Sequence, residues 1–64
     1  MSMGMKIKLK RIEKKLKQYK VAELVGISRE YLRLIENDAA SNPSITVMKN
    51  IAKVLDTPVQ ELFF

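Results

Sequence analysis

The chain of 64 residues contains no cysteine and no histidine, and it has only two glycines and two prolines. Without cysteine it cannot form a disulfide or a thiolate metal site. Without histidine it lacks the usual protein ligand of zinc and haem and the commonest general base. No apolar run approaches the roughly 18 residues that span a bilayer. We therefore expect a soluble protein of a reducing compartment, with no metal or other cofactor and no membrane segment.

Groups that carry catalysis are also scarce. Ser–His and Cys–His pairs are impossible, and two glycines cannot build a phosphate-binding loop. The seven acidic residues are spread singly along the chain. We therefore expect that the protein is not an enzyme.

The chain is rich in apolar residues and in basic charge. Hydrophobic residues make up 47%, too many for a disordered tail. From 64 residues we expect at most one small domain, and no second domain for a small-molecule effector. The net charge is +5, and eight of the twelve basic residues lie between Lys6 and Lys20, beside the single acid Glu13. Such a run suits a polyanion, either nucleic acid or an acidic membrane surface. It is equally compatible with a lysine-rich helix face in solvent.

A first helix is predicted from about Lys6 to Leu16, after an N-terminus (residues 1–5) that we expect to be disordered or left over from expression. Apolar residues recur at spacings of four, three and four, which predicts one buried face made of Met5, Leu9, Ile12 and Leu16. The basic run around them is amphipathic, as in helices that lie on membranes. Because the core is expected to use the apolar face, membrane insertion is disfavoured.

A second helix is predicted from near Gln18, with Val21, Leu24 and Val25 as its apolar positions. Gly26 is predicted to end it, because glycine adopts positive φ freely after a helix C-terminus.

A third helix is predicted from about Ser28 to Asn37. Ser28 is a good N-cap, and Leu32 and Ile35 are expected to face inward. Asn37 or Asp38 can adopt the left-handed conformation that closes a helix where glycine is absent.

A loop with the sequence NDAASNPS follows. Ser44 is predicted to cap a fourth helix, whose inward face comprises Ile45, Met48, Ile51, Ala52 and Leu55. Thr57 as N-cap, Pro58 at the first helical position and Gln60 as capping-box partner predict a short fifth helix. Its apolar residues are Val59, Leu62 and Phe63.

Five short helices joined by short loops predict a compact all-α domain over residues 6–64. The second and third helices have the features of a helix-turn-helix, in which two helices cross closely at a turn that contains glycine. Ala22 supplies a small residue for the crossing, and Gly26 supplies the backbone freedom of the turn. The third helix packs its inner face and leaves its N-terminal outer face free.

The chain resembles the Cro and phage-repressor (XRE-type) helix-turn-helix regulators. The family's leading glutamine, alanine, glycine and two core aliphatic residues correspond to Gln18, Ala22, Gly26, Leu32 and Ile35. The segments GIS, IEN, NPS and IAKVLDTPVQELF match as well, so the resemblance covers residues 6–63. It implies a lambda-repressor-like fold whose third helix, from about Ser28 to Asn37, reads the major groove of DNA.

The resemblance implies base contacts by three residues of this helix, Arg29, Glu30 and Leu34, and we expect Arg33 as a fourth contact, to a base or to a phosphate. Arginine can donate two bonds to guanine, and glutamate can accept one from cytosine. Leu34 departs from the polar residue usual in the family, and can contact only a thymine methyl group. Without the flanking motifs, we would interpret Arg29 and Arg33 as ordinary solvated charges, with Glu30 as the i,i+3 partner of Arg33.

The resemblance also implies phosphate contacts. Gln18 is expected to contact a phosphate and to brace the recognition helix, so that Gln18→Ala would weaken binding to all sequences alike. The other expected phosphate contacts are Lys20, Ser28, Asn37, Ser41, Asn42 and Ser44. Because the loop that contains residues 41–44 has no lysine or arginine, non-specific affinity would depend more on the basic first helix and on Lys20.

Two further assignments follow from the resemblance. Arg11 and Glu36 occupy the positions of a partly buried ion pair, with ordinary surface charges as the alternative. The apolar C-terminal residues Leu62, Phe63 and Phe64 either form a homodimer contact or close the core of the monomer.

The sequence therefore predicts a cytoplasmic, bacterial or phage, sequence-specific double-stranded-DNA-binding regulator of transcription, with repression as its expected action. The alternative is a protein-interaction or antitoxin-like module on the same fold, with weak or non-specific DNA binding.

Overall fold

The protein is described by a computed structural model, which covers residues 1–40 and 42–64. It contains five α-helices and, within those residues, no strand. The helices are α1 (Met3–Glu13), α2 (Gln18–Val25), α3 (Arg29–Glu36), α4 (Ile45–Val54) and α5 (Val59–Phe63). The all-α prediction and the order of the helices are confirmed.

Serine residues begin three of the helices. The hydroxyls of Ser2, Ser28 and Ser44 accept hydrogen bonds from backbone amides three residues later, at 3.1, 3.0 and 3.2 Å. The first residue of α2 follows Lys17, whose side chain makes no capping bond. The backbone amides of Gln18 and Tyr19, in the first turn of α2, therefore receive no side-chain cap from Lys17.

The first four helices end in the same way, with a residue in the left-handed conformation. That residue is Lys15 after α1, Gly26 after α2, Asp38 after α3 and Asp56 after α4. The next amide bonds back to a carbonyl in the last turn, as Leu16 does to Arg11 at 3.1 Å and Ile27 to Ala22 at 3.0 Å. Only one of the four left-handed residues is a glycine, so three of these helix ends carry a steric cost.

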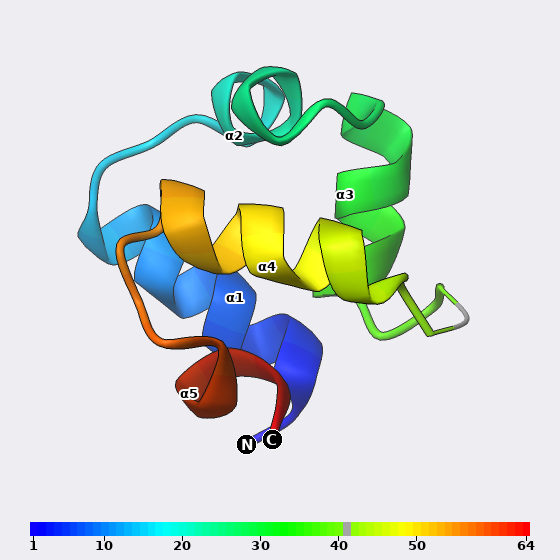
Figure 1. Cartoon of the computed structure of the whole chain (residues 1–64). Helices are drawn as coiled ribbons and strands as arrows, with labels where there is room; N and C mark the ends of the chain where they lie inside the picture. The colour runs from blue at the N-terminus through cyan, green and yellow to red at the C-terminus, as the bar shows by residue number, and fades with distance from the viewer. Residues whose placement is uncertain (41) are drawn as a thin grey trace.

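The helices enclose one core, arranged as Figure 1 shows. α2 contacts α3 and α4, α1 contacts α3 and α5, and α4 contacts α5. The buried hydrophobic residues come from all five helices or the residues next to them: Ile7, Val21, Ala22, Val25, Leu32, Ile35, Ile51, Ala52, Leu55 and Leu62. The inward positions predicted for α3 are thereby confirmed.

The predictions for α1 were wrong in two respects. The helix begins at Met3 and ends at Glu13, so residues 3–5 are helical and Leu16 lies beyond the helix end, although it still packs on the core. The helix also presents a different face to the core. Gly4 and Ile7 are buried, whereas Met5, Leu9 and Ile12 are exposed. The apolar row predicted to be buried therefore faces solvent.

Gly4 explains why α1 turns this face inward. A Cβ atom at position 4 would lie 2.5 Å from the carbonyl oxygens of Ile35 and Glu36. Only a residue without a Cβ allows α1 to approach the end of α3 so closely. Ile7 and Arg11 follow Gly4 at spacings of three and four and share its face of the helix.

Three predictions elsewhere also need correction. Ile45 is 59% exposed, because it opens α4 ahead of Val47, the first residue of that helix to pack on the core. Leu24 is exposed on α2. Thr57 is not an N-cap: it is buried, and its hydroxyl donates to the carbonyl of Leu55 at 2.9 Å, while α5 begins after Pro58 without a side-chain cap.

Candidate nucleic-acid interface

The turn between α2 and α3 has the geometry that the sequence predicts. Gly26 has φ 89° and ψ 29°, in the left-handed region. Ala22 is 2% exposed, and its carbonyl accepts the amides of both Gly26 and Ile27. Because the side chain of Ala22 is buried in the core, a larger residue there would disturb the packing of α2.

One face of α3 packs on the core and the other is open to solvent. Leu32 and Ile35 are buried, whereas Arg29, Glu30 and Arg33 are exposed. Three of the four predicted base contacts thus lie on the open face of one helix. Leu34, the fourth, is half-buried, so less of it can reach a ligand.

Glu30 and Arg33 are paired with each other. The Nε atom of Arg33 donates to Oε1 of Glu30 at 2.9 Å, one turn along α3. The hydrogen bond from Arg33 lowers the pKa of the Glu30 carboxyl, and the same bond raises the pKa of Arg33. A base contact by either residue therefore competes with this exposed pair.

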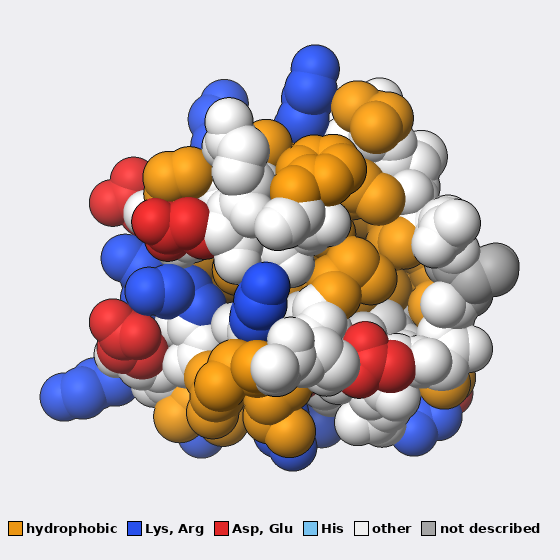
Figure 2. All heavy atoms as spheres, turned by 90° about the horizontal axis from the view of Figure 1, so that it is seen from below, with side chains coloured by type: hydrophobic (Ala, Val, Ile, Leu, Met, Phe, Trp, Pro, Cys, Tyr) orange, Lys and Arg blue, Asp and Glu red, His pale blue; other side chains and the backbone are white. Residues whose placement is uncertain are grey.

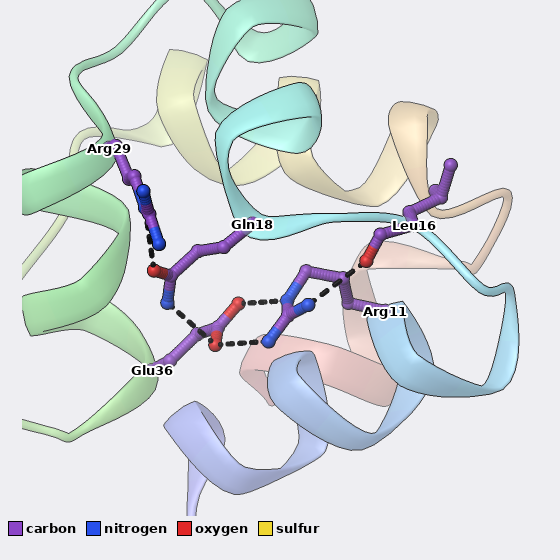
Figure 3. A network of polar contacts seen from close by, with 5 residues as sticks. All are labelled: Arg11, Leu16, Gln18, Arg29 and Glu36. Atoms are coloured by element: carbon purple, nitrogen blue, oxygen red, sulfur yellow. Dashed lines mark hydrogen bonds and ion pairs between the residues drawn. The ribbon is translucent and has the colours of Figure 1, made fainter.

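Arg29 belongs to a chain of hydrogen bonds that joins three helices (Figure 3). Its Nε atom lies 3.4 Å from Oε1 of Gln18, and Nε2 of Gln18 donates to Glu36 at 3.2 Å. Glu36 in turn accepts two bonds from Arg11, at 2.7 and 3.1 Å. The guanidinium at the start of α3 is thus connected through α2 to a charge pair between α1 and the end of α3.

The buried part of this chain is the ion pair expected between Arg11 and Glu36. The Glu36 side chain is 2% exposed and that of Arg11 is 13% exposed. Arg11 also donates to the carbonyl of Leu16 at 2.9 Å, which fixes the segment that leads into α2. A buried carboxylate is costly unless it is paired and hydrogen-bonded, and Glu36 meets both conditions.

Gln18 connects the buried pair with the exposed arginine. Glu36 can only accept a bond from Gln18, so the Gln18 NH2 group must face Glu36 and its carbonyl must face Arg29. The sequence identified Gln18 as a brace for the recognition helix, but it did not reveal that both ends of the amide are engaged. Because no periodicity or spacing links residues 11, 18, 29 and 36, only the resemblance to the family drew attention to them.

Some of the predicted phosphate contacts are exposed, and others already make hydrogen bonds within the protein. Asn37 and Asn42 are exposed. The hydroxyls of Ser28 and Ser44 cap α3 and α4. Lys20 bonds to Glu23 at 3.0 Å, and this bond raises the Lys20 pKa. Ser41 lies outside the described residues.

Lys17 was not among the predicted contacts, yet it lies beside the N-terminus of α2. It is exposed, and it immediately precedes the uncapped first turn of that helix. Backbone amides and a nearby ammonium group together attract an anion. The absence of Ser, Thr, Asp or Asn at position 17 was the signal in the sequence that could have identified it.

The C-terminal residues differ in their accessibility. Leu62 is buried in the core and Phe63 packs partly against it, whereas Phe64 is 75% exposed. Leu62 therefore closes the core of the monomer and is not available for a dimer contact.

Among the described residues, no helix is long and apolar enough to cross a membrane. Within residues 1–40 and 42–64, no three acidic side chains gather as a metal site would require.

The chain is similar in sequence to known helix-turn-helix proteins. The model of a family described as Helix-turn-helix matches residues 7–62. The transcriptional regulator SinR of Bacillus subtilis is 37% identical over 59 residues, which cover 92% of this chain and 53% of SinR. The immunity repressor of Bacillus phage phi105 is 39% identical over 62 residues, covering 97% of this chain and 42% of the repressor. The chain spans about half the length of these relatives or less.

Solved structures resemble the whole chain. The crystal structure of SinR in complex with DNA has a TM-score of 0.91 at 35% identity, covering 98% of this chain and all of the SinR chain in that structure. The restriction-modification controller protein C.AhdI of Aeromonas hydrophila has a TM-score of 0.88 at 31% identity, covering 95% and 91% of the two chains. Both similarities extend over all five helices.

Proposed function

Because the chain belongs to the XRE-type helix-turn-helix family, we propose that it binds double-stranded DNA in a sequence-specific manner and regulates transcription. Repression is the proposed mode, since a phage immunity repressor is among its relatives. In this proposal α3 enters the major groove and places Arg29, Glu30 and Arg33 against base edges.

One observation carries the proposal: the guanidinium of Arg29 is exposed at the start of α3 and is held from behind by Gln18. Gln18 is itself held by Glu36, which is buried and paired with Arg11. An arginine positioned in this way loses less side-chain entropy on binding than a free one. It is therefore suited to a two-bond contact with guanine.

The phosphate backbone would be held at two helix N-termini and by exposed basic side chains. The uncapped start of α2, with Lys17 next to it, can receive one phosphate. A second segment of the DNA backbone can be positioned by Asn37, Asn42 and the start of α4. Each phosphate neutralised should add about −0.9 to the slope of log affinity against log salt concentration.

We further propose that the protein acts in the cytoplasm as a homodimer on two-fold sites. Phe64 and the exposed part of Phe63 are the candidate dimer contact, since Leu62 is committed to the core. Light scattering over a range of concentrations tests this contact. A monomer at high micromolar concentration, in the absence of DNA, would exclude a pre-formed dimer.

The DNA-binding proposal is tested by selecting duplexes from a randomised pool at near-physiological salt. The wild type and Arg29→Ala are selected in parallel, with Lys49→Ala as a control that removes an exposed basic charge from α4. The wild type and the control should enrich the same two-fold site, and Arg29→Ala should lose the preference for one base pair in each half-site. If the wild type retains DNA without any preferred sequence, the proposal is wrong.

A further inference from the structure

The outer side of α1 carries an apolar surface whose residues are not among the proposed DNA contacts. Met5, Leu9 and Ile12 are 42%, 43% and 51% exposed. Their spacings of four and three place them in one row along the helix, which we call the α1 stripe. Single exposed apolar residues are ordinary, but a row of them on one helix is a candidate surface for a partner.

Basic residues flank the α1 stripe on both sides. At 100° per residue, Lys8 lies on one side of the row, and Lys6 and Lys10 lie on the other. Lys10 approaches Glu13 at 3.5 Å. Within the described residues, Lys6 and Lys8 form no ion pair. Their charges therefore remain available to carboxylates of another molecule.

A groove adjoins the stripe between α1 and α5. It has a volume of about 190 Å³, and Leu9, Leu62 and the side chains of Lys6 and Lys10 contribute to its lining. Figure 2 views the molecule from the side of α5 and the two termini, and there hydrophobic side chains reach the surface with basic ones beside them. A ridge of apolar residues next to a small groove with apolar and charged walls is a surface that an amphipathic helix can pack against.

We propose that the α1 stripe and this groove bind an amphipathic helix of another protein, one whose apolar face is bordered by acidic residues. The apolar face would cover Met5, Leu9 and Ile12, and one of its side chains would enter the groove. The bordering carboxylates would pair with Lys6 and Lys8, as oppositely charged residues do beside the seam of a coiled coil.

Charge argues against two other occupants. A second copy of this chain would bring two lysine-flanked stripes together, and like charges at an interface are repulsive. An anionic bilayer would attract the lysines, but it would repel Glu13 and Glu61, which also line the groove. A partner helix can place a neutral or basic residue opposite these two carboxylates.

The stripe shares no residue with the surface proposed to contact DNA. Arg29, Glu30 and Arg33 belong to α3, whereas the stripe belongs to α1 alone. The partner should therefore bind the protein both in the presence and in the absence of DNA. This distinguishes the proposed site from a surface that merely attracts any acidic molecule.

The test uses a synthetic helical peptide with leucines along one face and glutamates on both sides of them. It is titrated into the isotopically labelled protein, and the backbone amide signals are followed by NMR. The largest shifts are expected at Met5, Leu9 and Ile12, with and without bound duplex DNA. A scrambled peptide of the same composition should bind at least about tenfold more weakly, since it has no continuous apolar face.

Two matched variants locate the site on the protein. Leu9→Ser should weaken peptide binding about tenfold, since it removes an apolar contact from the centre of the stripe. Leu24→Ser removes a comparably exposed leucine from α2 and should leave binding unchanged. Because both leucines are exposed, both variants should retain the helical circular dichroism of the wild type.

Four results would overturn the proposal. They are shifts centred on Arg29 and its neighbours, equal binding by the scrambled peptide, equal effects of the two variants, and loss of peptide binding when DNA is added. A concentration-dependent mass that Leu9→Ser abolishes would assign the stripe to a second copy of the chain. Adsorption to phosphatidylglycerol vesicles that Leu9→Ser abolishes, without peptide binding, would assign it to a membrane.

Discussion

The backbone amide of Gly4 donates a 2.9 Å hydrogen bond to a carboxylate oxygen of Asp38, although 34 positions separate the two residues. Asp38 adopts the left-handed conformation that ends α3, and Gly4 lies in the first turn of α1. The end of the proposed recognition helix is thus fixed by the beginning of the chain. The carboxylate also lies at a helix N-terminus, where negative charge is favourable.

The first prediction concerns pH. Hydrogen bonds from the Ser2 hydroxyl and the Gly4 amide lower the pKa of Asp38. Because the folded protein favours the ionised carboxyl, its contribution to stability is complete above the pKa of the unfolded chain, about 3.9. The contribution is lost as the pH falls through the lower pKa of the folded state. The urea midpoint should therefore fall between pH 5 and pH 3.

Two variants separate Asp38 from the other carboxylates. Asp38→Asn should lower the midpoint at pH 5 and reduce its dependence on pH, because asparagine keeps the left-handed conformation but not the charge. Asp56→Asn is the control: Asp56 ends α4 in the same conformation, and the described structure shows no hydrogen bond to its carboxylate. Equal pH dependence in the two variants would contradict the role given to Asp38.

The second prediction is that Gly4→Ala destabilises the protein by roughly 1–3 kcal/mol, the usual cost of overpacking. Helix propensity alone favours alanine over glycine by about 1 kcal/mol. Here a Cβ atom would meet two backbone carbonyl oxygens at 2.5 Å, so the steric cost should exceed that gain. Chemical denaturation measures the difference, with Met5→Ala as an exposed control expected to change stability by less than about 0.5 kcal/mol. A stabilised Gly4→Ala would show that α1 shifts without penalty.

The sequence predicted the number and order of the helices, the N-caps Ser28 and Ser44 and the end of α2 at Gly26, because these depend on local patterns. It misassigned the buried face of α1. The row of Met5, Leu9 and Ile12 is periodic and apolar, whereas the face that packs combines Ile7 with a glycine and an arginine. Periodicity identifies a candidate face, but the close approach at Gly4 decides which face is covered.

For the candidate site, the sequence predicted individual residues but not how they are connected. Resemblance to a known family indicated Gln18, Arg29 and the pair of Arg11 with Glu36 one by one. It could not show that they form one hydrogen-bonded chain, because the chain depends on how α1, α2 and α3 pack together. Lys17 was not predicted, because it acts through the helix terminus beside it. Asp38 was predicted only as a possible end of the third helix, and its bond to Gly4 depends on how α1 packs against that end.

The third prediction is that Lys15→Gly stabilises the protein. Lys15 has φ 59°, which costs a residue with a Cβ about 1–2 kcal/mol, and its side chain is exposed. Glycine relieves this cost but increases the entropy of the unfolded chain, by about 0.4–1 kcal/mol. The net gain should be about 0.5–1 kcal/mol, measured as a shift of the urea midpoint.

Lys14→Gly is the matched control for this prediction, because it removes the same charge at the neighbouring position. Lys14 has φ −84° and ψ 3°, a conformation that any residue can adopt. Glycine there brings no relief and should lower stability by roughly 0.5–1 kcal/mol. If the two variants had the same stability, the left-handed conformation of Lys15 would carry no measurable cost.

The fourth prediction concerns Gln18 and rests on the proposed DNA binding. The sequence-based expectation is that Gln18→Ala weakens binding to all sequences alike, because Gln18 would contact only a phosphate. In the structure its carbonyl also accepts a bond from Arg29. Gln18→Ala should therefore lower affinity for the selected site about fivefold to tenfold, the cost of one or two hydrogen bonds. It should also reduce the difference in affinity between duplexes that differ at the base pair that Arg29 contacts.

Affinities for the selected duplex and for duplexes changed at each base pair measure both effects. Tyr19→Ala is the control, since Tyr19 is an exposed neighbour on α2 and makes no hydrogen bond through its side chain in the described residues. It should leave the base preferences unchanged. In an Arg29→Ala background, Gln18→Ala should lower affinity without changing any preference further, because the residue that it positions is gone. Uniform weakening by Gln18→Ala in the wild-type background would mean that Gln18 acts through the phosphate alone and that Arg29 selects its base without support from α2.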